Sequence, residues 1–574
     1  MKAGGWRRPL GRCRWARLYK SRNWTHRWPS MNPSRRSFPL IAAGLLLGSL
    51  LGCTSRGGCS GDYCGTLVIA AAGEPDILLS PITQLGIARD VSDQLFLKLA
   101  DLGMSANTIG DDGFVPQLAA RWDWTDSVTL TFHLDPRAKW QDGVPVTAAD
   151  VAFTFDIYSD STVDSPSRSA LREIVAVTAR DSLTAVFRFR RPYAEMFYDA
   201  VYHMRVLPAH LLRDVPRTAW QAAPFGRQPI GDGPYRFVRW KAGESLELAA
   251  DSTFFLGRPH LRRLIWRFTP NLDVAVSQLI AGQADAIEVL GPPANLKRVH
   301  DVAGLATYPY PGNTYGFLAF NLRANGDTSA PHPLFGNREL RRAIVMALDR
   351  EGMLHNVWGG GDLAAVPPGP MPRLWSLWDS SLARNLAHDS VAEARLLAAQ
   401  RGRRAFHLLV PTTSGLRRQY ARLIQAQLQP FGWDVRIDEL DLAVVQQRVG
   451  AGQFDAVLGA WYSGPSPIDG TLQNWTRRGF GGLNPGRYDN PQLDRLLEGA
   501  ARTRSREAAT RQLRSAIALW NSDAPAATLY APDNVAAVNR RVSEVTIRPD
   551  SWLALVRMWR IPASQLSGRD RVGS

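Results

Sequence analysis

The sequence has few cysteines and lacks the short motifs of several enzyme classes. Only four cysteines occur in 574 residues, and none follows Cys64, which excludes a cysteine nucleophile in the folded body of the chain. The ten histidines never form the HExxH pattern of a zinc protease, and no GxSxG, GxGxxG or Walker motif occurs. We therefore expect no enzyme, no cofactor and no metal site.

The sequence also lacks an apolar run long enough to cross a membrane. The run Phe38–Leu51 has 14 residues, whereas a spanning helix needs about 20. It follows two arginines and stops just before Cys53, as the apolar core of a signal peptide does. Leu50–Cys53 resembles a lipoprotein signal-peptidase site, and Ser34–Phe38 resembles a twin-arginine export signal. A short membrane anchor with a cytosolic tail is the alternative interpretation.

These features predict an exported lipoprotein. We expect residues 1–52 to be removed, Cys53 to carry lipid, and residues 53–65 to tether the protein to the periplasmic or extracellular side of a membrane. Met31 would start a signal peptide of ordinary length, so we interpret residues 1–30 as a misassigned translation start.

Two further cysteines, Cys59 and Cys64, lie in this tether. In an oxidising compartment they are candidates for a disulfide. A CxxxxC metal site is the alternative, but no second pair of ligands follows it.

Acidic residues are absent from residues 1–52, and this absence biases the composition. The whole chain has a formal charge of +16, but residues 53–574 contain 57 Lys and Arg against 52 Asp and Glu, a charge of +5. So small a charge on a chain of this length predicts no nucleic-acid partner. Apolar residues make up 45% of the chain, which predicts a globular protein of more than one domain.

Strand and helix patterns alternate along the rest of the chain. Val128–Leu134 alternates with a period of two, as a half-buried strand does. Further on, a βαβαβ unit is predicted from Phe406–Val410, a helix capped by Thr413 or Ser414, Asp434–Leu440, Leu442–Val449 and Phe454–Leu458. This unit predicts a largely parallel sheet. Helices that end at Gly282 and Gly452, each followed by a strand, indicate two α/β lobes with a cleft between them.

Five blocks of sequence occur in the order typical of one known family. Val115–Tyr158 contains an Asp142-Gly143 turn and a helix start at Thr147 with Asp150 in its first turn. The other blocks are Pro229–Trp240, Gly316–Leu322, Leu340–Leu354 and Tyr488–Leu497. Together they resemble the family-five extracellular solute-binding proteins, the peptide- and nickel-binding receptors of ABC importers.

The resemblance implies an α/β fold of the two-lobed periplasmic-binding-protein type II class, with a third subdomain and a hinge between the lobes. Lobe one would comprise residues 66–110, 218–310 and 535–562, the inserted subdomain 111–217, and lobe two 311–534. Residues 563–574 would form a C-terminal tail.

The resemblance also implies a function. The chain would be a monomer that captures a solute, an oligopeptide by family default, and presents it to ABC permease and ATPase subunits. A secreted, lipid-anchored hydrolase stays the alternative, because paired catalytic carboxylates have no fixed spacing in a sequence. A surface lipoprotein without a transport role is a further alternative.

Specificity residues match the family less well. In peptide-binding relatives an aspartate shortly after a tryptophan holds the α-amino group of the ligand. Here Gly464 stands three residues after Trp461, and Asp469 is the nearest acid. An ammonium group buried without a carboxylate is costly, so a peptide ligand is an expectation at the level of the family.

We place six residues in the cleft. Trp461, Tyr462 and Asp469 follow the strand that would carry the missing aspartate, and Glu74 follows the first strand of lobe one. Asn313 and Tyr315 lie just before the strand that enters lobe two. The alternatives are that Trp461 belongs to the core of its lobe and that Glu74 is a solvated loop carboxylate.

Overall fold

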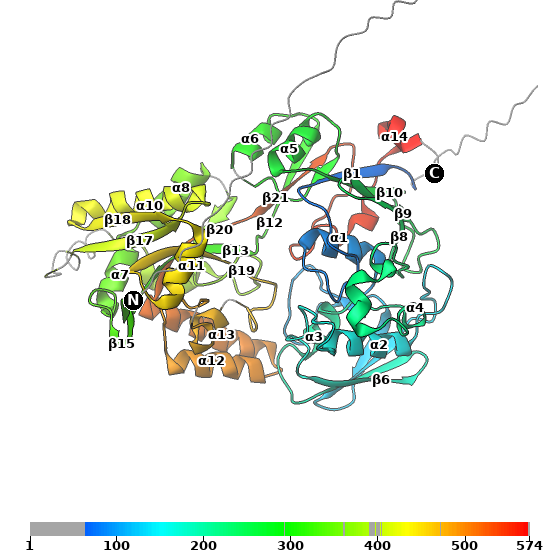
Figure 1. Ribbon diagram of the computed structural model, residues 1–574, viewed down its shortest axis with the longest axis horizontal. Coiled ribbons are helices and arrows are strands. Elements are labelled where there is room, and N and C mark those ends of the chain that lie inside the picture. Colours follow the sequence, from blue (N-terminus) through cyan, green and yellow to red (C-terminus); the bar gives the residue numbers. More distant parts are fainter. Residues whose placement is uncertain are drawn as a thin grey trace, which may run out of the picture. The chain divides into compact units, whose positions relative to one another are not determined.

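The computed structural model describes residues 63–571, apart from 292, 360, 361, 390–396, 398–401, 403, 471 and 481. The expected signal segment, Cys53 and Cys59 lie outside the described residues. Within the described part, no helix is long and apolar enough to cross a membrane. Two large sheets and one four-stranded sheet organise this part of the chain (Figure 1).

The first large sheet collects strands from distant parts of the sequence. Its order is β12 (Leu305–Tyr310), β21 (Asn534–Asn539), β11 (Ala286–Ile287), β1 (Thr66–Ala71), β10 (Arg263–Phe268), β9 (Ser245–Ala250) and β8 (Tyr235–Lys241). Strand β1 is parallel to β10 and β11, and the other pairs are antiparallel. The accompanying helices are α1 (Gly86–Leu95), α5 (Leu272–Ile280) and α6 (Pro293–His300).

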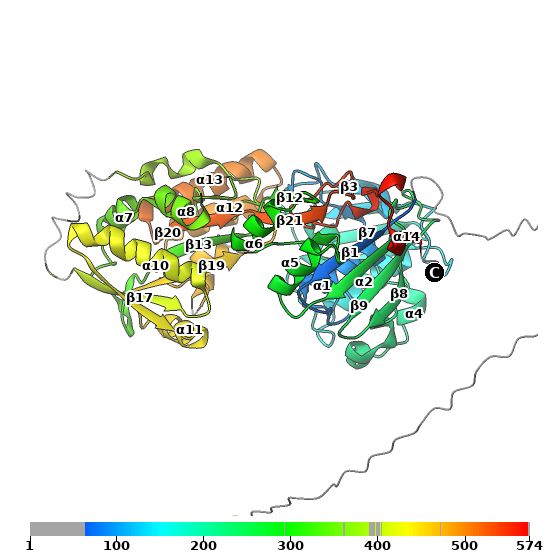
Figure 2. The same cartoon turned by 90° about the horizontal axis from the view of Figure 1, so that it is seen from above.

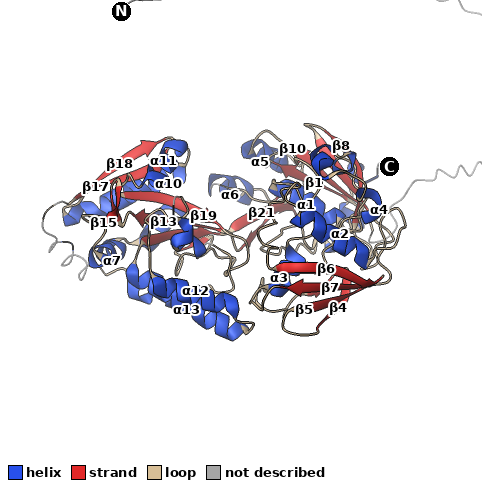
Figure 3. Ribbon diagram, turned by 60° about the horizontal axis from the view of Figure 1, so that its bottom comes forward, coloured by secondary structure: helices blue, strands red, loops and turns tan. Residues whose placement is uncertain are grey.

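The four-stranded sheet is antiparallel throughout and lies within the predicted inserted subdomain (Figure 3). Its order is β4 (Ala119–Trp124), β5 (Thr129–Leu134), β7 (Thr184–Phe189) and β6 (Ile174–Asp181), and its helices are α2 (Ala148–Ser159), α3 (Met196–Tyr202) and α4 (Ala209–Leu212). Helix α2 starts with the predicted cap, because Thr147 and Asp150 form a reciprocal capping box. A short ribbon, β2 (Ala100–Asp101) with β3 (Val115–Pro116), precedes this sheet.

The second large sheet contains the predicted βαβαβ unit. Its order is β16 (Ala364–Ala365), β20 (Ala526–Pro532), β13 (Thr314–Phe320), β19 (Ala456–Tyr462), β17 (Ala405–Pro411) and β18 (Asp434–Leu440). Strand β17 is parallel to both β18 and β19, which confirms the parallel unit. The sheet as a whole is mixed, because β13 is antiparallel to β19 and β20.

Helices cover both faces of this sheet. They are α7 (Arg338–Ala347), α8 (Arg350–Trp358), α10 (Gly415–Leu428), α11 (Leu442–Ala451), α12 (Pro491–Arg502) and α13 (Arg506–Asp523). The hydroxyl of Ser414 caps α10 as predicted, by accepting from Arg417 N. Gly282 and Gly452 follow α5 and α11 with φ of +70° and +69°, which confirms their predicted role as helix ends. An outlying ribbon pairs β14 (Arg323–Ala324) with β15 (Asp327–Pro331).

The chain passes between the two large sheets at two adjacent places. One passage, residues 311–313, joins β12 to β13, and the other, Asp533, joins β20 to β21 (Figure 2). The passages pack tightly, because a Cβ added at Gly312 would lie 2.1 Å from the carbonyl oxygen of Pro532. Two short connections that touch one another are suited to act as a hinge.

The C-terminal segment, predicted as a tail from residue 563 onward, contains a short helix. Residues Gly568–Arg571 form helix α14, and the side chain of Asp570 has no exposed surface. Its carboxylate accepts from Thr66 N at 2.7 Å and from Arg541 Nη1 at 2.8 Å. Arg541 also binds Asp285, so a buried ion network fixes this segment to the first large sheet.

Candidate functional site

The main candidate site is a cavity of about 440 Å³ beside the two passages between the sheets. Helix α1 and the segment that includes Trp552 lie on the side of the first sheet, and Tyr462 extends from the end of β19 on the side of the second. Asn313 and Asn534 belong to the passages themselves. We call this space the cleft cavity, and groups from both large sheets face it.

Two acidic side chains of the cleft cavity, Asp90 and Glu288, have no ion-pair partner among the residues that the structure describes. Asp90 lies on α1, and its Oδ2 accepts from Trp552 Nε1 at 3.1 Å. Glu288 directly follows β11. Neither forms an ion pair within the described residues, and the Glu288 side chain forms no hydrogen bond there. Burial, with the nearby charges of Glu288 and Asp93, raises the pKa of Asp90 well above its ordinary value. Burial also raises the pKa of Glu288 to about 7.

Most basic side chains of the cleft cavity already form ion pairs within the protein. Arg205 forms an ion pair with Asp93 at 2.5 Å, and Lys98 pairs with Asp101 at 3.4 Å. Arg89 donates to the carbonyl oxygen of Gln84 at 3.2 Å and forms no ion pair within the described part of the chain. The ionisable groups left without an ion pair in the described part are therefore Asp90, Glu288 and Arg89.

A second cavity, of about 450 Å³, adjoins the first. The two share Gly86, Asp90, Glu288 and Trp552 as common wall. The remaining lining is largely apolar and includes Ile69, Trp266, Leu272, Ile287 and Val289. We call it the apolar cavity. A solute that reached from one cavity to the other would pass the two carboxylates.

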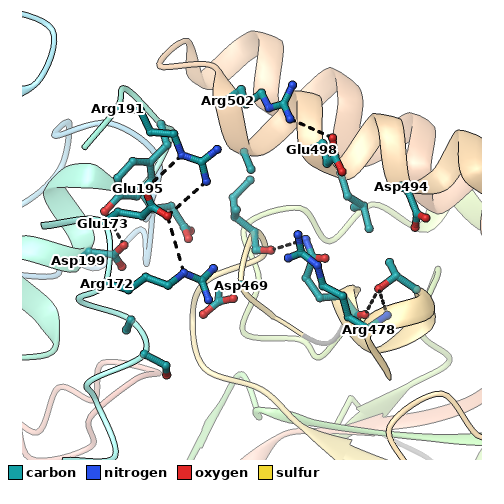
Figure 4. Close-up of a pocket in the computed structure, with 18 of the residues that line it drawn as sticks. Arg172, Glu173, Arg191, Glu195, Asp199, Asp469, Arg478, Asp494, Glu498 and Arg502 are labelled. Carbon is teal, nitrogen blue, oxygen red and sulfur yellow. Dashed lines mark hydrogen bonds and ion pairs between the residues drawn. The ribbon is translucent and has the colours of Figure 1, made fainter. Parts of the chain in front are cut away.

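A third cavity, of about 370 Å³, lies between the predicted inserted subdomain and the second large sheet. Figure 4 shows Glu195, Asp199 and Asp469 among its charged side chains. Glu195 accepts from Thr108 Oγ1 at 2.5 Å and from Ser466 Oγ at 2.6 Å, so its carboxyl group joins two distant segments. Burial, followed by the charge of Asp199, raises its pKa to about 8.

Comparison with known proteins identifies the family. Residues 113–482 match the bacterial extracellular solute-binding proteins, family 5 Middle. The chain belongs to this family. This agrees with the predicted resemblance, and the protein is a solute-binding protein.

Relatives of this solute-binding protein match nearly its whole folded part. The oligopeptide-binding protein AppA of Bacillus subtilis is 24% identical over 86% of this chain and 91% of its own length. Protein XP55 of Streptomyces lividans is 28% identical, over 86% and 89%. The structure of the ABC transporter substrate binding protein CtaP of Listeria monocytogenes matches with a TM-score of 0.75 at 21% identity, over 87% of this chain and 100% of CtaP. The predicted two-lobed α/β fold is thereby confirmed.

The residues predicted for the cleft of this solute-binding protein lie in four different places. Asn313 and Tyr462 both line the cleft cavity, and the Tyr462 side chain is 69% exposed. Asp469 lies in the third cavity instead, beside Asp199; burial, then that neighbouring charge, raises its pKa. Glu74 lines the apolar cavity, but its carboxylate already accepts from Trp240 Nε1 and Gly243 N.

Tyr315 packs in the core of the second large sheet, and Trp461 is partly buried against that core. Tyr315 has no exposed surface, and its hydroxyl accepts from Trp475 Nε1 at 3.1 Å. It therefore cannot contact a solute in this structure, contrary to the expectation. Trp461 lies opposite Tyr315 in the β13–β19 register and packs against the same core.

One cysteine expected in the tether can be located. Cys64 is buried, and its thiol is free in this structure. Its expected partner, Cys59, lies outside the described residues.

Sequence reasoning missed Asp90, Glu288 and Trp552, although a signal existed for one of them. Ligands of α/β proteins bind at the carboxyl ends of the strands. The strand predicted after Gly282 ends immediately before Glu288, so Glu288 occupies that position. No comparable signal marks Asp90 or Trp552, which reach the cleft cavity from segments far away in the sequence.

Proposed function

We propose that this solute-binding protein captures a peptide or peptide-like solute in the cleft cavity and presents it to the permease and ATPase subunits of an ABC importer. The observation that carries the proposal is the composition of the cleft cavity at the passages between the sheets. Acidic and basic side chains without an ion pair in the described part, Asp90 and Glu288 on one hand and Arg89 on the other, suit the termini or side chains of a peptide. The amides of Asn313 and Asn534 suit its backbone groups.

The position of the cleft cavity supports a mechanism of capture by closure. Tyr462 belongs to the second large sheet, whereas Asp90 and Glu288 belong to elements of the first. A solute that contacts both groups binds the closed arrangement more tightly than the open one, and this difference drives closure. The permease then recognises the closed form.

We further propose that the protein acts as a monomer anchored by lipid at Cys53. A lipoprotein carries more than one acyl chain, which suffices for stable anchoring. Such an anchor keeps the receptor close to the membrane that holds the permease.

A ligand screen tests this function. Peptides of three to nine residues, oligosaccharides and metal chelates are added to the purified protein, and its thermal unfolding is followed. A ligand at 100 times its Kd stabilises the folded state by about 2.7 kcal/mol. For a peptide found in this way, Tyr462→Ala should weaken binding about tenfold by calorimetry, because a large exposed ring is lost from the cavity.

Phe480→Ala is the matched control, since Phe480 is 38% exposed and outside the cleft cavity. It should leave the Kd unchanged. Stabilisation by sugars or chelates but by no peptide would contradict the peptide ligand, and cleavage of an added compound would favour a hydrolase.

A further inference from the structure

We infer that Asp90 and Glu288 form the specificity site of the cleft, and that they select peptides carrying a positively charged group next to an apolar side chain. This inference rests on the proposed function and narrows it from peptides in general to one chemical class. The charged group is an ammonium or guanidinium, from either the peptide's amino terminus or a Lys or Arg side chain.

The first step is the placement of the two carboxylates. Both lie on the wall that the cleft cavity and the apolar cavity share, so a bound chain that extends from one cavity to the other passes them. Helix α1 fixes the backbone of Asp90, and the indole of Trp552 fixes its carboxylate by donating to Oδ2. Glu288 reaches the same wall from the end of β11.

The second step is that no basic side chain among the described residues forms an ion pair with either carboxylate. Among the described residues, each of the other acids of the cleft cavity, Asp93 and Asp550, has an arginine partner, at 2.5 Å in both cases. Asp90 and Glu288 have none. The one basic side chain of the cavity without an ion pair in the described part, Arg89, is hydrogen-bonded to Gln84 O. Two carboxylates near one another and without an ion-pair partner repel each other, and a cation bound between them would relieve that repulsion.

The third step concerns the kind of cation. A calcium ion takes six to eight oxygen ligands, and magnesium needs near-octahedral geometry. Two carboxylates beside an indole N–H donor do not provide such a shell, and no group of three or more metal-ligating side chains occurs among the described residues. An organic cation needs only hydrogen bonds to carboxylate oxygens, which both side chains offer.

The fourth step concerns the side chain of the peptide that lies next to its positively charged group. The apolar cavity opens beside the carboxylates and is lined by Ile69, Leu272, Ile287 and Val289. An aliphatic or aromatic side chain fits this lining, whereas a charged one would lose its hydration. The two cavities together therefore favour a basic group adjacent to an apolar side chain.

Matched peptides test the inference by calorimetry with the purified protein. The probes are N-acetylated, C-amidated Ala-Lys-Leu and Ala-norleucine-Leu, with free-amino forms of both to separate a terminal ammonium from a side-chain one. The expected result is that a probe with an ammonium group binds about 10- to 100-fold tighter than its neutral counterpart, as expected for a charge-assisted hydrogen bond. Asp90→Asn and Glu288→Gln should each reduce that preference, and the double variant should remove it.

Glu244→Gln is the matched control, because Glu244 is an exposed carboxylate on the turn between β8 and β9 and lines neither cavity. It should keep the full preference. If Asp90→Asn does not fold, Glu288→Gln carries the test, since its side chain has no partner in the described residues to lose. Equal binding of charged and neutral probes, or an unchanged preference in the variants, overturns the inference.

Spermidine separates this inference from the proposed function. If spermidine binds and Glu288→Gln weakens its binding while no peptide binds, the cation site stands and the peptide function fails. If the neutral peptide binds as tightly as the charged one, the peptide function stands and the cation site fails. If neither peptides nor spermidine bind, the cation site is overturned as well.

Discussion

The buried carboxyl group of Glu195 predicts how the free energy of unfolding should change with pH. Its side chain is 3% exposed and joins Thr108, which precedes the four-stranded sheet, to Ser466, which follows β19. Glu195→Gln removes the titrating group and keeps a side chain that can donate to one hydroxyl and accept from the other. The variant therefore isolates the contribution of this one proton.

The sign and size of this pH dependence follow from the pKa of Glu195 in the folded protein and in the unfolded chain. Burial and the charge of Asp199 raise the pKa of Glu195 to about 8 in the folded protein, whereas a glutamate in an unfolded chain titrates near pH 4.3. Between these values the folded state holds a proton that the unfolded state has lost, so the free energy of unfolding falls as pH rises. The slope is about 1.4 kcal/mol per pH unit, or about 3 kcal/mol between pH 5.5 and 7.5.

Urea unfolding at pH 5.5, 6.5 and 7.5, followed by tryptophan fluorescence, measures this effect. We expect the stability of Glu195→Gln relative to the natural protein to increase by about 3 kcal/mol across that range. Glu498→Gln is the control, because Glu498 borders the same cavity but is exposed and paired with Arg502; its difference from the natural protein should stay constant. A constant difference for Glu195→Gln as well would refute the reasoning.

Two further predictions concern the hinge and the anchor. Gly312→Ala should destabilise the protein by about 1–3 kcal/mol, because its Cβ would meet the Pro532 carbonyl and force the two passages apart; Gly304→Ala, which meets no atom within 4 Å, should change thermal stability little. Cys53→Ser should abolish incorporation of radiolabelled palmitate in an expressing bacterium, while Cys64→Ser, at a buried thiol, should retain it. Label in the Cys53 variant would contradict the lipid anchor.

Local elements could be predicted from the sequence because their determinants are themselves local. The cap at Ser414, the capping box of Thr147 and Asp150, and the positive φ of Gly282 and Gly452 each depend on a few neighbouring residues. The same is true of the order of strands and helices between β17 and β19. The family resemblance then supplied the arrangement of the lobes, which local patterns do not contain.

The site was harder to predict because strand β13 is buried on both faces. Leu318 and Phe320 pack in one core, whereas Tyr315, Phe317 and Ala319 pack in the other. Such a strand shows no alternation that separates a core side chain from a site side chain. Tyr315 therefore looked accessible in the sequence.

Trp461 and Tyr462 show that one position along a strand can separate a side chain packed against the core from a side chain that lines the cleft cavity. The two residues are adjacent at the end of β19, so their side chains leave the strand on opposite sides. Trp461 shares its side with the core, and Tyr462 lines the cleft cavity. Beyond it the chain turns away, and Ser466 binds Glu195, which explains why Asp469 lies in a different cavity.

The distribution of residues around the cleft cavity separates two tasks of a solute-binding protein. In our proposal, Asp90 and Glu288 select the solute by charge, and both belong to elements of the first large sheet. A solute that touched only these groups would bind open and closed states equally and would shift no equilibrium between them. Tyr462, at the end of β19 in the second sheet, supplies the contact that differs between the states. Selectivity and closure then depend on different residues, so charge selection can be altered at Asp90 and Glu288 while the contact that drives closure is retained.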